Sequence, residues 1–323
     1  MAQAAFLDSL GGPEGFALRA HNPPPPSSGE LRIRHTAIGL NFIDIYQRKG
    51  LYPVALPAIL GSEAAGVVEA VGAGVEQFKP GERITYISGG GAYAEIANAP
   101  AAMAAKIPEA IDDDVAAAVF LKGLTAEMLL RQVHVLNAGE TCLIHAAAGG
   151  VGTLLCQWAK HLGAKIIAVV GNEEKAAIAR DNGADHIIIR TQTTMLAAEV
   201  RKLTGGHGVN VVYDSVGEAT FEGSLDSLAM RGHMVTYGNA SGPVPAISPL
   251  ELSRRGSLTL TRPSLFHYAT PDRLPVMAAA LFDMVAKGVV RPMIANRFKL
   301  ADIADAHRLL ESGKSTGAII VTP

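Results

Sequence analysis

The stretch HAAAGGVGTLLCQWAK, residues 145–160, decides the fold. It reads as the end of a strand, a glycine turn and the start of a helix. In a dinucleotide-binding turn the first glycine permits a tight turn, the second lets the backbone approach the pyrophosphate, and the third lets helix and strand pack closely. Here Ala147, Gly149 and Gly152 stand at those positions, with Gly150 and Val151 between them. The free N–H groups and positive dipole end of the helix favour a phosphate.

The sequence around this turn supports a nucleotide site over a purely structural turn. From about residue 140, strands alternate with helices. The strands read ETCLIHA, AKIIAVV, HIIIR, VNVVYDS, GHMVTYG and GSLTLTR, and the helices read GTLLCQWAKHLG, NEEKAAIARDNG, TTMLAAEVRKLTG and TFEGSLDSLAMRG. Each helix ends near a glycine, as helices commonly do. This alternation predicts an α/β fold with a doubly wound parallel sheet whose first turn is the glycine turn.

The end of the second strand indicates which nucleotide is bound. NAD sites place an acidic residue there for the ribose hydroxyls, whereas this chain has Gly171 and Asn172. The acidic residues 173–174 fit the first turn of a helix behind an Asn172 N-cap. Lys175 and Arg190 are two cations near an acid-free pocket, which favours a 2′-phosphate and hence NADPH over NADH. The alternative for either cation is a solvated surface charge.

The rest of the chain narrows the class of protein. The first 120 or so residues carry short alternating segments separated by turns, which predicts a β-rich domain. A net charge of −2 argues against nucleic acid or an anionic membrane as partner. The most apolar stretch, VAAAVFLKGLTAEMLL, is interrupted by Lys122 and Glu127 too soon for a membrane span. With no signal-peptide pattern and two cysteines in apolar segments, we expect a cytoplasmic protein with buried thiols.

A set of motifs in fixed order resembles one family. GLNFIDIYQRKGLYP, LPAILGSEAAGVVEAVGAGV, KGLTA, HAAAGGVG, VVYDSVG, YGNASG and TRPSL are similar to the zinc-independent quinone oxidoreductases, of zeta-crystallin type, in the medium-chain dehydrogenase/reductase superfamily. The resemblance covers nearly the whole chain. It implies a GroES-like substrate domain formed by residues 1–123 and 265–323, with a Rossmann NADPH-binding domain, residues 124–264, inserted between them. It also implies a homodimer paired through the edge strand 257–262, which would otherwise be exposed.

The resemblance also assigns site residues. Asn41, Phe42, Asp44 and Tyr46 would face the nicotinamide, and Tyr52 would lie at the mouth of the substrate site; turn formation and aromatic packing are the alternatives for these motifs. Lys122 and Thr125 would lie where the cofactor enters. The remaining cofactor contacts expected from the family are Ser215, Tyr237, Gly238, Asn239, Ala240, Arg262, Pro263 and Ser264.

Two positions of this chain, Arg190 and Gly313, differ from the residues that the family commonly has there. The family commonly has a tyrosine at Arg190, and an arginine on the phosphate side at Gly313, beside which this chain has Lys314. Asp214, which ends a strand, could be catalytic, but structural hydrogen bonding is the better interpretation of a carboxylate there.

The sequence predicts that zinc is absent. Zinc-dependent relatives have a cysteine ligand near Asn41, a Gly-His-Glu motif where this chain reads Gly61-Ser62-Glu63, and a four-cysteine lobe. This chain has two cysteines, neither of them in the first domain, and no paired metal spacing among its ten histidines.

The expected activity is NADPH-dependent reduction of a quinone, with hydride passing from the nicotinamide to a quinone between the domains. A quinone is already a strong electron acceptor, so alignment and hydrogen bonds to the oxygens that gain charge are what the protein must supply. Asn41, Tyr46 and Tyr52 are the candidates for positioning, with Tyr46 as the proton donor if one is used. The alternatives are an enone or 2-alkenal C=C reductase, and an NADPH-binding crystallin or RNA-binding protein without significant turnover.

Overall fold

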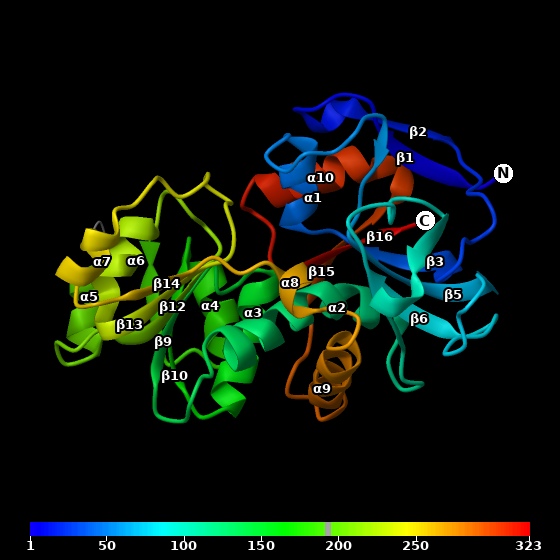
Figure 1. The fold of residues 1–323 in the computed structure, drawn as a ribbon. Coiled ribbons are helices and arrows are strands. Elements are labelled where there is room, and N and C mark those ends of the chain that lie inside the picture. Colours follow the sequence, from blue (N-terminus) through cyan, green and yellow to red (C-terminus); the bar gives the residue numbers. More distant parts are fainter. Residues whose placement is uncertain (191–194) are drawn as a thin grey trace. The chain divides into compact units, whose positions relative to one another are not determined.

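The computed structural model describes residues 1–190 and 195–323, and these residues form two compact units. Unit 1 comprises Met1–Leu124, Ala269–Ala286 and Pro292–Pro323, and unit 2 comprises Thr125–Tyr268 and Lys287–Arg291. Both chain termini belong to unit 1 (Figure 1). The expected domain boundaries fell after residues 123 and 264; in the structure the first division lies within a helix, and residues 265–268 and 287–291 group with unit 2.

Unit 1 is built mainly from strands. Its strands are β1 (Gln3–Leu7), β2 (Phe16–Ala20), β3 (Glu30–Gly39), β4 (Ala58–Ile59), β5 (Glu63–Val71), β6 (Arg83–Ile87), β7 (Ile96–Pro100), β8 (Ala104–Lys106), β15 (Ile294–Lys299) and β16 (Ala318–Thr322). Its helices are η1 (Pro13–Gly15), α1 (Phe42–Arg48), η2 (Ala101–Met103), α2 (Asp113–Met128, which continues into unit 2), α9 (Leu274–Ala286), η5 (Leu300–Asp302) and α10 (Ile303–Glu311).

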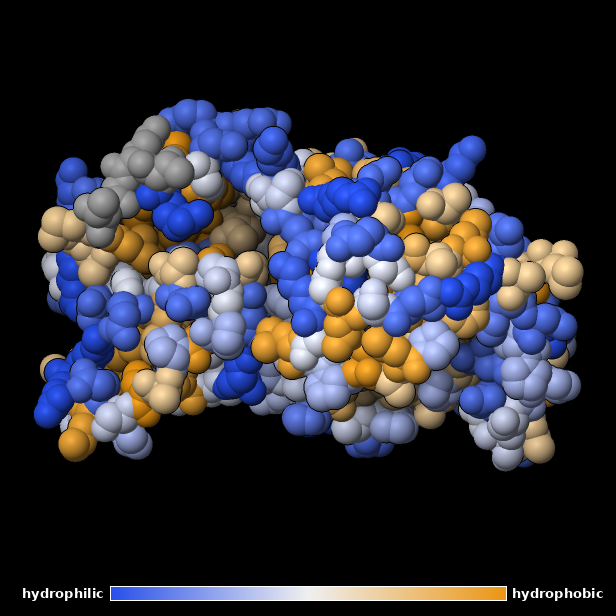
Figure 2. Space-filling model, turned by 90° about the horizontal axis from the view of Figure 1, so that it is seen from above, coloured by the Kyte–Doolittle hydropathy of each residue, from blue (hydrophilic) through white to orange (hydrophobic). Residues whose placement is uncertain are grey.

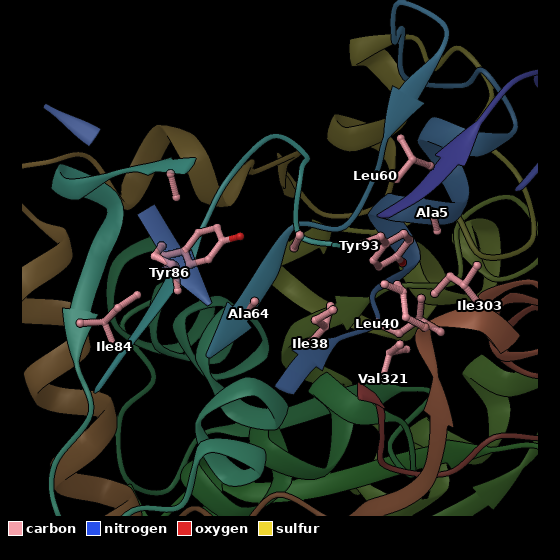
Figure 3. Close-up of a cluster of buried hydrophobic side chains, with 14 of the residues drawn as sticks. Ala5, Ile38, Leu40, Leu60, Ala64, Ile84, Tyr86, Tyr93, Ile303 and Val321 are labelled. Carbon is pink, nitrogen blue, oxygen red and sulfur yellow. The ribbon is translucent and has the colours of Figure 1, made fainter. Parts of the chain in front are cut away.

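The largest sheet of unit 1 runs in the order β15-β16-β3-β5-β6-β8, with β7 also paired to β3, and a second sheet runs β2-β1-β4. The predicted alternation is clearest in β3, where Leu31 and Ile33 are buried while Arg32 and Arg34 point outward. Both arginines form ion pairs with Glu69 on the neighbouring strand β5. One hydrophobic core joins the two sheets and α10 (Figure 3).

Unit 2 alternates strands with helices, as the sequence predicts. Its strands are β9 (Thr141–His145), β10 (Lys165–Val170), β11 (His186–Ile189), β12 (Val209–Asp214), β13 (Leu228–Thr236) and β14 (Thr259–Thr261). Its helices are η3 (Leu129–Val133), α3 (Gly150–His161), α4 (Glu173–Asp181), α5 (Leu196–Leu203), α6 (Phe221–Ser227), α7 (Pro249–Arg254) and α8 (Leu265–Tyr268). The predicted helix over residues 193–205 begins in a part that lies outside the described residues.

The six strands of unit 2 form one parallel sheet in the order β11-β10-β9-β12-β13-β14. Helices α3 and α4 contact each other, as do α5 and α6, and the two pairs lie on opposite sides of the sheet (Figure 1). The strand order reverses between β9 and β12, and in such sheets the crevice beyond the carboxyl ends at this point is where ligands bind. The doubly wound fold is therefore confirmed, with its switch point at the glycine turn.

One predicted element is wrong in its bounds. The fourth helix was expected over residues 220–232, but α6 ends at Ser227 and β13 already begins at Leu228. Leu228 pairs with Val209, and the register then shifts before His233 pairs with Val211. Arg231 adopts a φ of 61° within this irregularity. The spacing of apolar residues continues without a break from the helix into the strand, so the sequence does not show where α6 ends. The boundary is set by the pairing of β13 with β12.

None of the described helices is long and apolar enough to cross a membrane. On the face shown in Figure 2, hydrophobic residues are exposed in small groups between hydrophilic ones.

Candidate functional site

The glycine turn of unit 2 has the geometry of a phosphate-binding turn. Helix α3 begins at Gly150 with Gly149 as its N-cap, and no side chain caps it. The first N–H groups of the helix, from residues 150–152, have no acceptor within the helix and point out of its N-terminus. A Cβ on Gly152 would lie 2.2 Å from the backbone oxygen of Ala146, so only glycine allows this approach of helix and strand. The third glycine of the motif therefore has the packing role expected from the sequence.

The left-handed residue of the turn is Ala146, with a φ of 49°, and not the residue at the first glycine position. Ala147 is fully buried, and its N–H donates to the backbone oxygen of Val169 on β10 (3.3 Å). An alanine is tolerated at the first glycine position because the backbone there keeps a negative φ, which the sequence could only assume.

The expected cations follow β10 and β11, the two strands that come after β9 in the order of the sheet. Asn172 caps α4 by accepting a hydrogen bond from the N–H of Lys175 (2.9 Å), so the acidic residues 173–174 lie in the first turn of α4 as predicted. Partial burial lowers the pKa of Lys175, and the neighbouring Glu174 opposes this shift. Arg190 is exposed directly after β11. Gly171 has open space where a Cβ would lie, so packing does not require glycine there.

The loops that follow β12 and β13 bring several expected contacts together. The backbone oxygen of Ser215 accepts from the N–H of Ala240 (3.2 Å), and a Cβ on Gly238 would lie 2.3 Å from that oxygen. After β14, Arg262 donates to the backbone oxygen of Thr236 (2.9 Å). Arg262 also donates to the side-chain oxygen of Asn239 (2.9 Å) once that amide is oriented to satisfy its neighbours. The carboxyl ends of β12, β13 and β14 thus form one hydrogen-bonded group.

The other expected residues of unit 2 lie close by in the chain. Tyr237 donates its N–H to the backbone oxygen of Asp214 (2.8 Å). Pro263 is buried and Ser264 is partly buried before α8, and Thr125 is buried in α2. Their contact with a cofactor stays a prediction.

A network of buried hydrogen bonds links Asp214, at the end of β12, to His145, the last residue of β9 before the glycine turn. Asp214 accepts hydrogen bonds from the N–H groups of Val216 (2.7 Å) and Gly217 (3.2 Å) and from the hydroxyl of Ser224 (3.0 Å). That hydroxyl also lies 2.8 Å from Nε2 of His145, whose pKa is lowered mainly by burial. Asp214 is thus buried and makes the hydrogen bonds expected under the structural interpretation preferred from the sequence.

In unit 1, the segment that precedes α1 holds Asn41 in a fixed orientation. Its amide nitrogen donates to the backbone oxygen of Gly39 (3.3 Å) and to Oε1 of Glu63 (2.9 Å). Since both neighbours are acceptors, both amide hydrogens are used within the unit. What Asn41 can offer a ligand is therefore its side-chain oxygen, an acceptor.

Asp44 is fully buried and bound on all sides by donors of unit 1. Its carboxylate accepts from the N–H of Asn41 (2.9 Å), the hydroxyl of Ser62 (2.7 Å) and the hydroxyl of Tyr93 (2.9 Å). Burial raises the pKa of Asp44 to about 6, with a contribution from the charge of Glu63, while these hydrogen bonds lower it. This geometry suits a residue that holds the backbone of Asn41 in place from within the core of unit 1.

Lys122 is not a surface charge. It is 5% exposed on α2, and its ammonium donates to Oε1 of Glu63 (2.7 Å), the oxygen that also accepts from Asn41. The other oxygen of Glu63 accepts from the N–H of Leu121 (2.7 Å). A buried carboxylate needs such compensation to remain charged.

Three aromatic residues form a cluster on α1 and the loop after it. The rings of Tyr46 and Tyr52 lie 5.5 Å apart in an edge-to-face arrangement, and Phe42 lies 6.1 Å from Tyr46. Such pairs prefer this geometry because of the quadrupole of the rings. The structure thus brings together three of the expected residues that follow Asn41 in the sequence. Lys314 follows α10, and its N–H donates to the hydroxyl of Ser312 (3.1 Å).

Some residues around the site were not singled out from the sequence. Tyr93 and His307 reach Asp44 through the core of unit 1, and they are separated from it by 49 and 263 positions of sequence respectively. Glu63 entered only as part of the altered zinc motif. No local pattern marks these contacts, because they are made between distant segments. Among the described residues, no group of three or more His, Cys, Asp or Glu side chains could hold a metal ion.

A unit of mainly antiparallel sheets joined to a doubly wound unit with a dinucleotide turn defines a two-domain, nucleotide-dependent oxidoreductase. Two family models match the chain: an alcohol dehydrogenase GroES-like domain over residues 27–109, and the model described as zinc-binding dehydrogenase over residues 150–283.

Known proteins place the chain within that class. A quinone oxidoreductase of Pseudomonas aeruginosa is 48% identical over 326 residues, covering 100% of both chains. A 2-haloacrylate reductase of a Burkholderia species is 43% identical over 332 residues, covering 100% of this chain and 99% of the relative. The crystal structure of Escherichia coli quinone oxidoreductase complexed with NADPH matches with a TM-score of 0.97 at 44% identity, covering 100% of both chains. The chain belongs to the quinone oxidoreductases of the medium-chain dehydrogenase/reductase superfamily.

Proposed function

We propose that this chain is an NADPH-dependent quinone reductase. The observation that carries the proposal is the match of the whole chain, at 44% identity, to a quinone oxidoreductase whose structure contains NADPH. The glycine turn at the switch point, the absence of an acid at Gly171–Asn172 and the neighbouring Lys175 and Arg190 fit a dinucleotide with a 2′-phosphate.

The residues of unit 2 would hold the dinucleotide at three places. The N–H groups at the start of α3 would bind the pyrophosphate, Lys175 and Arg190 the 2′-phosphate, and the group formed by Ser215, Asn239 and Arg262 the remaining cofactor. When bound, the nicotinamide supplies the hydride that reduces the quinone.

The residues of unit 1 would position the acceptor. The side-chain oxygen of Asn41 can accept a hydrogen bond from a carboxamide or a hydroquinone hydroxyl but cannot donate one to a quinone oxygen. The phenols of Tyr46 and Tyr52 carry the donors for that oxygen, and Tyr46 is our candidate for a proton donor. The division of labour between a GroES-like substrate domain and a Rossmann domain is part of this proposal.

The activity test is oxidation of NADPH by the purified protein with 1,4-benzoquinone, 9,10-phenanthrenequinone, a 2-alkenal and 2-chloroacrylate. We expect rapid turnover of the quinones. A 2-haloacrylate reductase among the close relatives makes C=C reduction the second candidate. Turnover of the alkenal or haloacrylate alone would replace quinone reduction by that activity, and tight NADPH binding without any turnover would favour a binding protein.

Cofactor selection has its own test. Removing a charged hydrogen-bond partner costs about 1.5–3 kcal/mol, so Lys175→Ala and Arg190→Ala should each weaken NADPH binding by roughly tenfold or more and leave NADH binding unchanged. Lys165→Ala is the control, because Lys165 is an exposed cation at the opposite end of β10. An unchanged preference for NADPH in both variants would contradict the phosphate assignment.

Assembly and location complete the proposal. Strand β14 ends the strand order among the described residues, and we propose that residues 257–262 pair with the same strand of a second copy. Sedimentation should then give a dimer, and a monomer would contradict the pairing. A cytoplasmic location fits the two cysteines, which are both buried free thiols.

A further inference from the structure

A continuous chain of buried hydrogen bonds lies behind the segment that carries Asn41 and Tyr46. Asp44 accepts from the N–H of Asn41 and the hydroxyl of Tyr93, each at 2.9 Å. The same Tyr93 hydroxyl lies 3.0 Å from Nε2 of His307 on α10. The chain therefore runs from the first turn of α1 to a different element of unit 1.

The direction of each proton in this chain follows from the charge of Asp44. An ionised carboxylate can only accept, so the single proton of the Tyr93 hydroxyl points to Asp44. Nε2 of His307 must then carry a hydrogen and donate it to the phenol oxygen. His307 is neutral, because burial, together with the charge of Arg48, lowers its pKa to about 3. Among the described residues its Nδ1 has no hydrogen-bond partner, as this tautomer, with its hydrogen on Nε2, permits.

The surroundings hold Tyr93 and His307 rigidly. Both side chains are fully buried, and their rings meet edge to face at 5.6 Å. Phe16 packs on both rings, at 6.1 Å from Tyr93 and 4.9 Å from His307. Figure 3 shows the Tyr93 ring among Leu40, Ile303 and other apolar side chains of the core. The phenol can therefore serve as a fixed donor.

The charged groups around Asp44 are few and paired. Glu63 on β5 carries a negative charge that disfavours the ionised form of Asp44 and is compensated by Lys122 on α2. Arg48 on α1 is fully buried and pairs with Glu311 on α10. None of these pairs donates a hydrogen bond to Asp44, so its ionised form depends on Asn41, Ser62 and Tyr93.

We propose that Tyr93 and His307 are positioning residues of the quinone reductase site, which act through Asp44 to hold Asn41 and the first turn of α1. The inference rests on the proposed function and adds two residues to it. Without the Tyr93 hydroxyl, Asp44 takes up a proton at a higher pH. A protonated Asp44 holds the N–H of Asn41 less strongly, and the segment that carries Tyr46 loses its fixed position.

The test is the pH dependence of kcat/KM for 1,4-benzoquinone at saturating NADPH, between about pH 4.5 and 8. In Tyr93→Phe the acidic limb of this profile should move to higher pH by about one to two units, because the ionised form of Asp44 loses one hydrogen bond to a charged group. His307→Leu should move it less in the same direction, and His307→Gln should restore it, because a glutamine amide can donate to the phenol oxygen. Tyr86→Phe is the matched control: Tyr86 is equally buried and its hydroxyl pairs with Nε2 of His35 at 3.0 Å.

A second measurement separates this inference from the proposed function. The carboxyl ¹³C resonance of Asp44, assigned with Asp44→Asn, reports the proton directly and should titrate higher in Tyr93→Phe. An acidic limb that is unchanged, or that moves as far in Tyr86→Phe, overturns the inference even if quinone is reduced. If no quinone is turned over, the proposed function fails. The inference is then tested by the pH dependence of NADPH binding, in which Tyr93→Phe should shift the acidic limb upward as it would for kcat/KM. An unchanged acidic limb of NADPH binding, or one that moves as far in Tyr86→Phe, would overturn the inference.

Discussion

Replacing Asp44 by asparagine should change how the stability of unit 1 depends on pH. The pKa of Asp44 lies at about 6 in the folded protein, against 3.8 for an unperturbed aspartate, with burial as the main cause. The folded state therefore binds this proton more tightly than the unfolded state does. Protonation stabilises the fold fully below about pH 4, and this contribution is lost as the pH rises through about 6.

The magnitude follows from the shift. Two pH units correspond to about 3 kcal/mol, since one unit is worth about 1.4 kcal/mol. Asparagine has nearly the same shape and cannot ionise, and its amide can still accept from Asn41 while donating to the hydroxyl of Ser62. The free energy of unfolding of Asp44→Asn, measured relative to wild type, should therefore rise by about 2–3 kcal/mol between pH 4 and pH 7.

Hydrogen exchange, analysed by peptide and corrected for its intrinsic pH dependence, is the suitable assay because it resolves the two units. Peptides from β3 and β5 should show the gain, and peptides from β9 and β10 in unit 2 should not. A difference between variant and wild type that stays constant with pH, or that falls as the pH rises, would refute the reasoning.

Three further predictions concern other parts of the molecule. Gly152→Ala should weaken NADPH binding at least tenfold by forcing helix and strand apart, whereas Gly223→Ala, where a Cβ meets only ordinary contacts at 3.5 Å, should not; isothermal titration measures both. Neither Cys142 nor Cys156 should react with a thiol reagent at pH 8 before unfolding, because burial raises the pKa of both, that of Cys156 to about 12; two thiols should react in denaturant. Arg48→Leu breaks an ion pair with a partly exposed carboxylate of α10 and should cost about 2–4 kcal/mol of stability in urea unfolding; no loss would mean that the pair contributes little.

The sequence allowed the doubly wound unit to be predicted because its signals are local. The glycine turn, the Asn172 cap and the glycines that follow α3, α4 and α5 each lie within a few residues of the structure they specify. What could not be predicted depends on pairing between distant segments. Residue 228 starts a strand because it meets Val209 on β12, although its neighbours continue a helical pattern.

The candidate site shows the same limit. The motif around Asn41 indicated that this segment belongs to the site. A family pattern cannot tell which of its polar side chains face a ligand and which face the core of the unit. Only the folded chain shows that Asp44 faces inward to Tyr93 and that Lys122 is bound to Glu63. A lysine that would pass for a surface charge is buried because its partner comes from a strand that is 59 residues away in sequence.

Asn41, Ser62 and Glu63 stand at or near positions that hold zinc ligands in zinc-dependent relatives, and in this chain their side chains bond to other residues of unit 1. The nitrogen of Asn41 and the ammonium of Lys122 both donate to Oε1 of Glu63, and the hydroxyl of Ser62 donates to Asp44. Two buried carboxylates are thus balanced by one ammonium and several neutral donors. Groups that are already paired are held in place, and preorganised groups can orient a bound reactant without moving during the reaction. For an acceptor as reactive as a quinone, such orientation is the contribution that the protein has to make.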